Sequence, residues 1–380
     1  MKLSGDWLHA AGTQALLQAL VAQGFQALFV GGCVRNAILD MPVSDIDLAT
    51  DAHPETVLDI ARAAGFRAVP TGLQHGTVTV IVDGVAHEVT TLRRDVATDG
   101  RHAIVAYSTS VAEDAARRDF TMNAVYAQSN GAVVDPLGGL PDVLARQVRF
   151  VGDPDLRIRE DYLRILRFFR FHAVYGDPSH GIDAEGLAAC AANCAETETL
   201  SRERVGTEMR KLLSAINPGP AVAAMAQAGV LRVILPGASA QGLAVLAHLE
   251  DGMPRGWLCR LAVLGGYNPA DTLRLSRADA NAHDQIRAGI FADFGPDALG
   301  WLHGVTRAGD IVHARAAMSG FALPDGWQSA VARGAAAVFP VKAADLMPAL
   351  QGKALGARLL AAQDQWLRSG LTLTGDQLLA

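Results

Sequence analysis

The sequence predicts an α+β protein, in which a small mixed head is followed by a long helical remainder. Short apolar or alternating runs bounded by Gly, Asp or Pro lie in the first 140 residues, as is typical of β-strands. Beyond Pro141, segments rich in Ala and Leu at helical spacing dominate, and Pro and Gly pairs separate them. With 380 residues, half of them hydrophobic, the chain is long enough for two or more domains with large cores.

Strands and helices are expected to mix in the head. Apolar periodicity predicts helices over Thr13–Gln23 and Pro54–Ala64, and Pro54 suits the first turn of the second helix. The pair Asp83-Gly84 is typical of the tight turn of a hairpin. The expected strands are Ala27–Gly31, Ser44–Ala49, Thr77–Val82, Ala86–Leu92 and Ala132–Asp135.

Composition restricts the compartment and the partners. No apolar run reaches the ~20 residues that span a bilayer, and residues 1–30 lack the arrangement of a signal peptide, so no membrane association is expected. The cysteines are Cys33, Cys190, Cys194 and Cys259. They form no plausible disulfide framework, which favours a reduced, cytoplasmic protein.

The distribution of charge qualifies the net value. A formal net charge of −6 argues against a nucleic-acid partner. Between Arg146 and Arg170, however, seven arginines stand against four acids. A local basic face of this kind can bind RNA while the rest of the surface stays acidic.

A glycine turn and two carboxylates form the most distinctive pattern. The pair Gly31-Gly32 follows an expected strand and precedes a short helix, so the backbone can approach a triphosphate closely and the helix start offers free N–H groups. Thirteen residues later, Asp45 and Asp47 share one face of the next strand, where they suit a hard divalent cation. Either half alone is usually a plain turn or a solvated strand end. Together they indicate nucleotidyl transfer assisted by metal ions.

Glu88 is the third candidate carboxylate. It alternates with Val89 along its strand, so the two side chains are expected on opposite faces. If this strand lies beside that of Asp45 and Asp47, three carboxylates converge. From the spacing alone, a solvated strand residue is an equally good interpretation.

Two polar segments follow. Residues 93–116 are polar, contain Gly and have no amphipathic period, which favours a functional lid or a disordered segment. Next, the basic pair Arg117-Arg118 can meet phosphates, while Asp119 and Asn123 can bond ribose hydroxyls. Composition alone favours the simpler interpretation, which is a charged helix N-terminus.

The run from Arg159 to Phe171 is the second distinctive pattern. Its expected buried stripe consists of Leu163, Leu166, Phe169 and Phe171. Asp161, Arg164 and Arg167 fall at i, i+3 and i+6 along the other side. A neighbouring Asp and Arg offer an acceptor beside a donor, so they can accept the pairing edges of cytosine and adenine and reject those of guanine and uracil. The simpler interpretation is an intrahelical salt bridge, which is preferred unless the run lies beside the carboxylates.

These motifs resemble, in the same order, those of class II tRNA nucleotidyltransferases and bacterial poly(A) polymerases. The motifs cover residues 28 to 171, Leu200–Val205 looks like the family's neck region, and beyond about residue 215 only the helical character is similar. The motifs are Gly31-Gly32-x-x-Arg35, Asp45-x-Asp47, the Glu88 strand, Arg117-Arg118-Asp119-Phe120-Thr121-x-Asn123-Ala124, Asp135-x-x-Gly138-Gly139 and Glu160-Asp161-x-x-Arg164-x-x-Arg167.

The resemblance implies a polymerase beta-like nucleotidyltransferase head with a small β-sheet, followed by an all-helical neck, body and tail. The implied ranges are 1–140 for the catalytic head, 141–215 for the neck with its base-reading helix, 216–300 for the body and 301–380 for an RNA-binding tail. Residues 93–116 look like the flexible loop that helps the switch from C to A addition.

The resemblance also implies roles for individual residues. Asp45 and Asp47 would hold Mg²⁺, and Glu88 would be the supporting catalytic carboxylate. Asp161 and Arg164 would read the base. The implied nucleotide-binding residues are Gly31, Gly32, Arg35, Arg118, Asp119, Asn123, Asp161, Arg164, Arg167 and Arg170.

One position departs from the family pattern. Asn36 stands where the family often carries Asp, which removes a charge next to Arg35. This departure bears on fine positioning more than on the reaction itself.

The expected function is template-independent addition of C, C and A to the tRNA 3′ end from CTP and ATP, with release of pyrophosphate and no obligatory protein partner. A poly(A) polymerase shares the motifs, although the modest net charge of the chain argues weakly against it. An enzyme that adds only A or only CC also stays open. The three carboxylates argue against a catalytically silent RNA-binding protein, and the long helical remainder argues against a nucleotidyltransferase for a small molecule or a protein.

Overall fold

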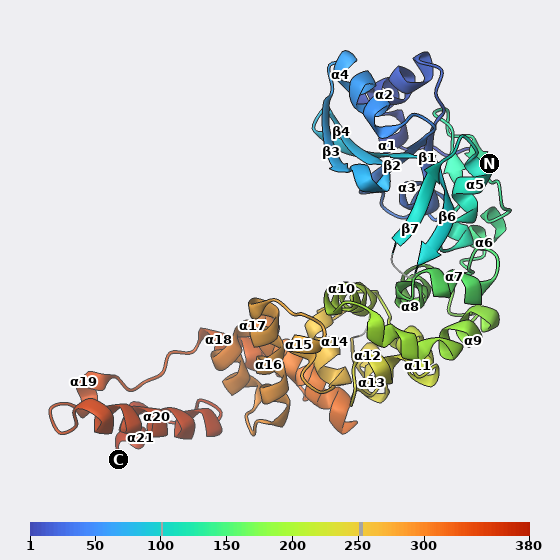
Figure 1. The fold of residues 1–380 in the computed structure, drawn as a ribbon. Coiled ribbons are helices and arrows are strands. Elements are labelled where there is room, and N and C mark those ends of the chain that lie inside the picture. Colours follow the sequence, from blue (N-terminus) through green and yellow to red (C-terminus); the bar gives the residue numbers. More distant parts are fainter. Residues whose placement is uncertain (100–101, 251–253) are drawn as a thin grey trace. The chain divides into compact units, whose positions relative to one another are not determined.

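The structure is a computed structural model that describes residues 1–99, 102–250 and 254–380 (Figure 1). The chain divides into two compact units. Unit 1 contains Met1–Leu200 and Gln227–Val230, and unit 2 contains Ser201–Ala226 and Leu231–Ala380. Among the helices of the described ranges, we find none with the length and apolar character that crossing a bilayer requires.

Unit 1 is built on a mixed sheet with the strand order β3-β4-β5-β2-β1-β8-β9. The central strands β2 and β5 are parallel, and the other neighbouring strands pair antiparallel. The strands of this sheet are β1 Ala27–Val30, β2 Ile46–Thr50, β3 Arg67–Gly72, β4 Thr77–Val82, β5 Val85–Thr91, β8 Tyr126–Ala127 and β9 Val133–Val134.

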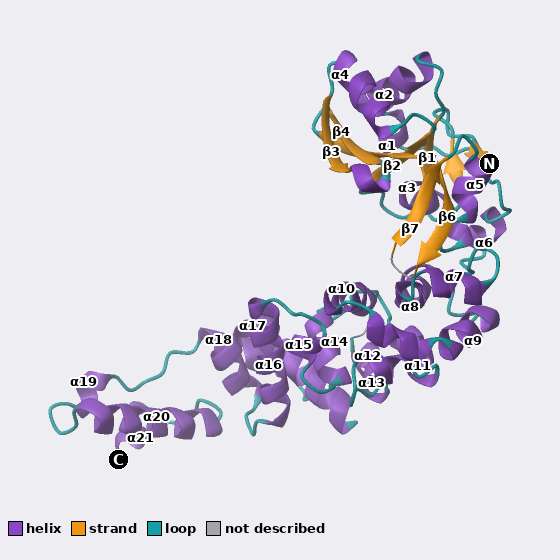
Figure 2. Ribbon diagram, in the orientation of Figure 1, coloured by secondary structure: helices purple, strands orange, loops and turns teal. Residues whose placement is uncertain are grey.

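The helices α2 (Ala11–Ala22) and α4 (Pro54–Ala63) lie side by side on one face of this sheet (Figures 1 and 2). Strand β4 alternates between half-buried and buried residues, and its valines at 78, 80 and 82 are buried. Strand β5 buries His87, whose Nε2 lies 2.9 Å from the hydroxyl of Thr13 on α2. The face covered by the helices therefore holds His87, and Glu88 points to the opposite face.

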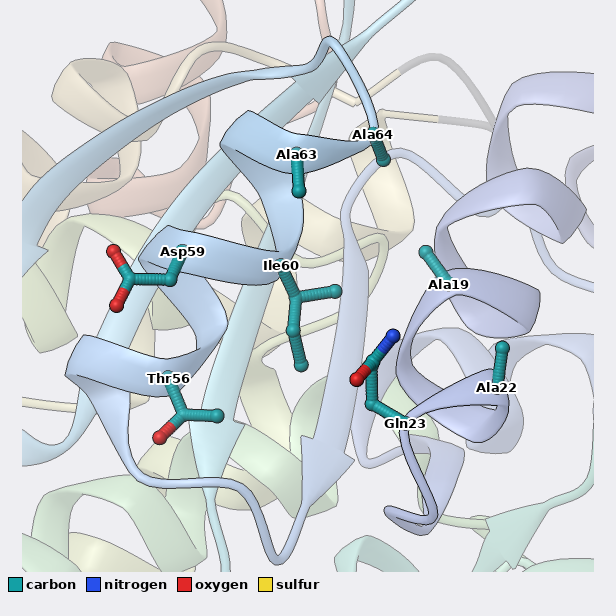
Figure 3. Close-up of a pocket in the computed structure, with 8 residues that line it drawn as sticks. All are labelled: Ala19, Ala22, Gln23, Thr56, Asp59, Ile60, Ala63 and Ala64. Carbon is teal, nitrogen blue, oxygen red and sulfur yellow. The ribbon is translucent and has the colours of Figure 1, made fainter.

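A groove of about 520 Å³ lies between α2 and α4 (Figure 3). The space is open because several of the side chains that line it are small. The lining residues are Ala19, Ala22, Gln23, Thr56, Asp59, Ile60, Ala63 and Ala64. None of them is a predicted site residue, so the site described below lies elsewhere in the unit.

The elements predicted for the head are confirmed with small shifts at their ends. Both predicted helices are present, and the five predicted strands correspond to β1, β2, β4, β5 and β9. The hairpin at Asp83-Gly84 is also confirmed, since Val82 pairs with Val85 and both turn residues have positive φ angles, 51° and 80°.

Of the two interpretations of residues 93–116, the disordered segment was wrong for the part that the structure describes, and the functional lid stays a prediction. The strands β6 (Arg93–Asp99) and β7 (His102–Tyr107) pair antiparallel and form a separate two-stranded sheet. Helix α5 (Val111–Ala116) follows, and the Ser110 hydroxyl caps it by accepting from the N–H of Glu113. The chain between β6 and β7 lies outside the described residues.

The part of unit 1 after β9 is helical. An aromatic cluster anchors it to the head, because Phe120 packs against Phe150 and Phe171 with ring centroids 5.0 and 4.8 Å away, and Phe150 stacks on Phe168 at 5.3 Å. The predicted buried stripe of residues 163, 166, 169 and 171 is confirmed. The remaining helices of unit 1 are α1 Asp6–His9, α3 Gly32–Ile38, α6 Leu140–Leu144, α7 Pro154–Glu160, α8 Leu163–Tyr175 and α9 Ala184–Ala192, with 3₁₀ turns at Leu73–His75, Thr121–Asn123 and Cys194–Thr199.

All regular elements after Val134 in the described residues are helices, as predicted (Figure 2). Helix α17 contains a kink at Gly304, which has a φ of 72°. The predicted boundaries at residues 140, 215 and 300 stay predictions. From Ser201 onward the helices are α10 Arg202–Leu213, α11 Gly219–Gln227, α12 Val230–Ile234, α13 Gln241–Leu249, α14 Trp257–Leu264, α15 Pro269–Thr272, α16 Arg277–Phe291, α17 Pro296–Ser319, α18 Trp327–Ala336, α19 Ala343–Leu346, α20 Gly352–Arg368 and α21 Gly375–Leu379.

Candidate nucleotide and metal site

The glycine turn connects β1 to α3 and lies against two other parts of the site. Gly31 has φ 69° and ψ −121°, a conformation that favours glycine, and Gly32 begins α3. A Cβ placed on Gly31 would lie 3.4 Å from Nη1 of Arg118 and 4.0 Å from Oδ2 of Asp47. The predicted phosphate turn therefore borders both the basic pair and the carboxylates.

Two of the three predicted carboxylates lie on neighbouring strands, and the third comes just before one of them. Asp47 on β2 pairs with Glu88 on β5, while Asp45 is exposed and comes directly before β2. Val89 is fully buried and Glu88 is exposed, which confirms that they face opposite ways. Burial and the nearby Glu88 carboxylate raise the pKa of Asp47 to about 6. A divalent cation bound here would offset this repulsion.

The donor set fits a hard divalent cation that takes only some of its ligands from the protein. Within the described ranges, no group of three or more His, Cys, Asp or Glu side chains is arranged to hold a metal ion on its own. Asp47 and Glu88 are therefore paired across neighbouring strands, but the three carboxylates do not form a complete metal site by themselves. Mg²⁺ commonly takes one or two carboxylates and completes its octahedron with water and substrate phosphates. Asp45, directly before β2, and Asp47, within β2, are two residues apart and match that pattern.

The basic pair is held by a buried carboxylate that the sequence interpretation missed. Asp114 on α5 is 1% exposed, forms ion pairs with Arg117 at 2.7 Å and Arg118 at 2.9 Å, and accepts the hydroxyl proton of Tyr126 at 2.7 Å. Burial alone would raise the pKa of Asp114, but the two guanidinium groups lower it to about 2. Its spacing of three and four residues from the two arginines was the signal that could have identified it.

A second network joins the helix α8 to the glycine turn. Nε of Arg167 donates to Oδ2 of Asp119 at 2.7 Å, and Nδ2 of Asn123 donates to Oδ1 of Asp119 at 2.9 Å. Asn123 in turn accepts from Nη1 of Arg35, three residues beyond Gly32. Burial alone would raise the pKa of Asp119, but the Arg167 guanidinium and these hydrogen bonds hold it below its usual range. The structure thus brings four predicted residues into one continuous network.

The predicted single helical face through Asp161, Arg164 and Arg167 was wrong. Asp161 has an extended backbone, ends α7, and accepts the N–H of Leu163 at 3.0 Å, so it lies at a helix junction. Arg164 forms an ion pair with Glu160 and also donates to the carbonyl of Arg157 at 2.8 Å. This ion pair joins α8 to α7 and does not lie within one helix, and the run lies beside the site through Arg167.

Arg170, the last predicted nucleotide-binding residue, lies on α8 with its guanidinium 4.5 Å from the ring centroid of Phe171. The missed residue on this helix is Tyr175, whose hydroxyl accepts from Nη2 of Arg35 at 2.7 Å. No motif in the sequence indicates this contact, because the two residues are 140 positions apart.

Comparison with known proteins gives a consistent result. Residues 27–149 match the poly A polymerase head domain, and residues 181–241 match the probable RNA and SrmB-binding site of polymerase A. The mitochondrial CCA tRNA nucleotidyltransferase 1 of Homo sapiens is 39% identical over 207 residues, covering 54% of this chain and 48% of that protein. The CCA-adding enzyme of Latilactobacillus sakei is 33% identical over 299 residues, covering 76% and 72% of the two chains.

A solved structure extends the likeness to almost the whole chain. The CCA-adding enzyme of Bacillus stearothermophilus in complex with CTP superposes with a TM-score of 0.73 and 28% identity, covering 94% of this chain and 92% of that one. By contrast, the aligned part spans about half the length of several curated relatives, such as the human protein.

A glycine turn beside carboxylates on a mixed sheet, followed by helices, defines a nucleotidyltransferase head of the poly A polymerase type. Nucleotidyltransferases of this kind generally use a divalent metal ion. The chain belongs to the family of CCA-adding enzymes.

Proposed function

We propose that this protein adds C, C and A to the 3′ end of tRNA, using CTP and ATP and releasing pyrophosphate. The observation that carries the proposal is the position of Asp47, which is paired with Glu88 and borders the Gly31 turn and Arg118. The family membership supports the same reaction. The aligned CCA-adding enzyme with CTP supports a nucleotide substrate.

The reaction is attack of the tRNA 3′ hydroxyl on the α-phosphate of the incoming nucleotide. Asp45 and Asp47 would hold Mg²⁺, which when bound activates the hydroxyl and neutralises charge on the leaving pyrophosphate. The exposed Glu88 supports this pair from the neighbouring strand. Gly31, Gly32 and Arg35 hold the triphosphate, so the residues mainly contribute positioning and charge stabilisation.

The two networks support the proposed phosphate and ribose contacts, and the family resemblance supports the base contacts. Asp114 fixes Arg118 beside the turn, where its guanidinium can meet a phosphate. Asp119 and Asn123 contact phosphate or ribose. The base is read by Asp161 and Arg164, with Arg167 and Arg170 in support, through complementary donors and acceptors.

The domain roles and the compartment belong to the same proposal. We assign the catalytic head to residues 1–140, the neck to 141–215, the body to 216–300 and an RNA-binding tail to 301–380. The match of residues 181–241 to a probable RNA-binding region supports RNA contact by the end of the neck and the start of the body. The cysteines are free thiols, which suits the reducing cytoplasm.

The deciding test is extension of tRNA transcripts that end before CCA, after C and after CC, with each nucleotide and Mg²⁺, read at nucleotide resolution. We expect growth to CCA and then arrest, from CTP and ATP but not from UTP or GTP. Unlimited addition of A would indicate a poly(A) polymerase. Addition of CC alone or A alone would indicate a partial enzyme, and no incorporation would favour a silent RNA-binding protein.

The variant Asp45→Ala tests the metal assignment in the same assay. We expect loss of turnover by at least about 10³-fold, with the fold and tRNA binding retained because Asp45 is exposed. Asp59→Ala is the matched control, since Asp59 is also an exposed aspartate of unit 1 and forms only an exposed ion pair with Arg62. Turnover by Asp45→Ala at the control's rate would overturn the assignment.

A further inference from the structure

Arg35 is held in a small cage of neutral groups. Its guanidinium lies 3.9 Å from the ring centroid of Tyr175 and 5.2 Å from that of Phe171, and the residue is only 6% exposed. Nη2 donates to the Tyr175 hydroxyl at 2.7 Å and to Oδ1 of Asn36 at 2.9 Å. Nε also donates to Asn36, and Nη1 donates to Oδ1 of Asn123.

Two consequences follow from these contacts. Among the described residues, no carboxylate forms an ion pair with Arg35, so its positive charge is not neutralised by direct contact. Four of the five N–H groups of a guanidinium are already donated, which leaves one on Nη1. Arg35 can therefore act on an anion only through its charge and one N–H, and its orientation decides whether that N–H is available.

We propose that Tyr175 is a positioning residue for the triphosphate, because it holds Arg35 in the orientation that serves the glycine turn. The proposal rests on the proposed function, in that the glycine turn receives a nucleotide triphosphate. Tyr175 supplies a hydroxyl acceptor and a ring face at the same time. Asn36 supplies only a neutral amide oxygen, and its Nδ2 is donated to the carbonyl of Pro42 at 2.8 Å.

The position of Tyr175 gives this contact a wider role. Tyr175 is the last residue of α8, the helix that also carries Arg164 and Arg167. Arg167 is also linked to Arg35, through Asp119 and Asn123. The base-reading helix is thus fixed to the phosphate-binding turn at two points, one ionic and one through Tyr175.

The test measures the binding of Mg²⁺-tripolyphosphate, CTP, ATP, UTP and GTP to the full chain without tRNA. Tyr175→Phe keeps the ring and removes the acceptor. We expect it to weaken tripolyphosphate and all four nucleotides by a common factor of about tenfold, with the preference for CTP and ATP over UTP and GTP unchanged. Tyr175→Leu, which also removes the ring, is expected to weaken them further.

A double-mutant cycle with Asn36→Asp separates positioning from general structural damage. A carboxylate at position 36 offers Arg35 a charged acceptor at the place where Asn36 already accepts two bonds. In the Tyr175→Phe background, Asn36→Asp should restore most of the tripolyphosphate affinity, while Asn36→Asp alone should change it less than about threefold. Tyr267→Phe is the control, because Tyr267 is 76% exposed and lies in unit 2.

Several results would overturn the assignment of Tyr175. They are tripolyphosphate affinity within twofold of the parent protein for Tyr175→Phe, no rescue by Asn36→Asp, or a loss confined to one base. A purely structural role would lower the melting temperature without changing the affinity of the folded protein for tripolyphosphate. If the parent protein binds nucleotides but extends no tRNA, the proposed function fails while the assignment of Tyr175 stands.

Discussion

Asp114 is a buried carboxylate that pairs with two arginines of the candidate site. It is surrounded by Arg117, Arg118 and Tyr126, and its pKa is about 2 because the guanidinium groups outweigh the effect of burial. Loss of one partner of a buried ion pair leaves an uncompensated charge. The residue therefore contributes to stability as well as to the position of Arg118 beside the glycine turn.

We predict that Asp114→Asn lowers the free energy of unfolding by about 3 kcal/mol at pH 7. The folded-state pKa lies below the unfolded value of about 4, so the stabilisation is fully present above pH 4. It is lost as the pH falls toward 2, and about half of it should remain at pH 3. Urea unfolding at pH 7, 4 and 3 measures the difference in free energy of unfolding between the parent protein and the variant.

The exposed variant Asp59→Asn serves as the control for Asp114→Asn and should stay within about 0.5 kcal/mol of the parent protein. If the difference in free energy of unfolding between the parent protein and Asp114→Asn is the same at pH 3 and pH 7, the carboxylate charge is not the source of the stabilisation. Nucleotide affinity of Asp114→Asn should also fall, because Arg118 loses the group that orients it.

At the scale of elements, the turn between β1 and α3 depends on one glycine rather than on both. Gly31 has a positive φ, and a Cβ there would approach Arg118 and Asp47. Gly32 has no positive φ, and a Cβ there would meet Nη2 of Arg35 at 3.8 Å, an ordinary contact. Substitution of each glycine by alanine therefore gives two variants of the same turn that differ in the backbone angle at the substituted position.

We predict that Gly31→Ala destabilises the protein by about 1–3 kcal/mol and weakens nucleotide binding, because an L-residue rarely adopts φ 69° with ψ −121°. Gly32→Ala should cost less than about 0.5 kcal/mol, since alanine favours the helix that begins there. Thermal unfolding and CTP titration of the two variants give the comparison. Equal effects of both substitutions would show that the backbone angle of Gly31 does not matter.

The elements also show which features the sequence could predict. The strands β1, β2, β4 and β5 were predictable because their apolar residues alternate or run between clear turn signals, and Asp83-Gly84 set the hairpin. Strand β6 (RRDVATD) is polar and gave no such pattern, whereas β7 (HAIVAY) carries an apolar run that the sequence interpretation missed. The order of the motifs identified the family. The pairing of Asp47 with Glu88 could not be predicted, because it depends on how the two strands come together in the folded sheet.

The helix break at Asp161 was hidden for a related reason. The run Arg159–Phe171 has continuous helical periodicity, and only the extended backbone of Asp161 with its bond to the N–H of Leu163 divides it. Aspartate competes for backbone N–H groups in this way, and tertiary packing decides whether it caps or continues a helix. Contacts between distant residues, such as Tyr175 with Arg35, cannot be derived from local periodicity at all.

On the scale of the whole molecule, the two compact units have separate cores, and a buried ion pair lies in the second. Arg260 is 1% exposed, and its Nη2 bonds Oε2 of Glu250 at 2.7 Å. The same guanidinium donates to the carbonyls of Leu213 and Ile216 at 2.7 and 2.9 Å, so it ties α14 to the end of α10. These contacts all lie within unit 2.

We predict that Arg260→Leu lowers the stability of unit 2 by about 3–5 kcal/mol, because Glu250 and the carbonyl groups lose their partner. The melting transition of unit 2 should shift down by at least several degrees. Binding of Mg²⁺-CTP, which we propose for unit 1, should stay within twofold of the parent protein below that transition. Calorimetry and CTP titration measure these two effects. Arg333→Leu is the control, since its ion pair with Asp297 is exposed and worth at most about 1 kcal/mol. Loss of CTP binding in step with the loss of unit 2 would show that the two units unfold as one and that the nucleotide site depends on both.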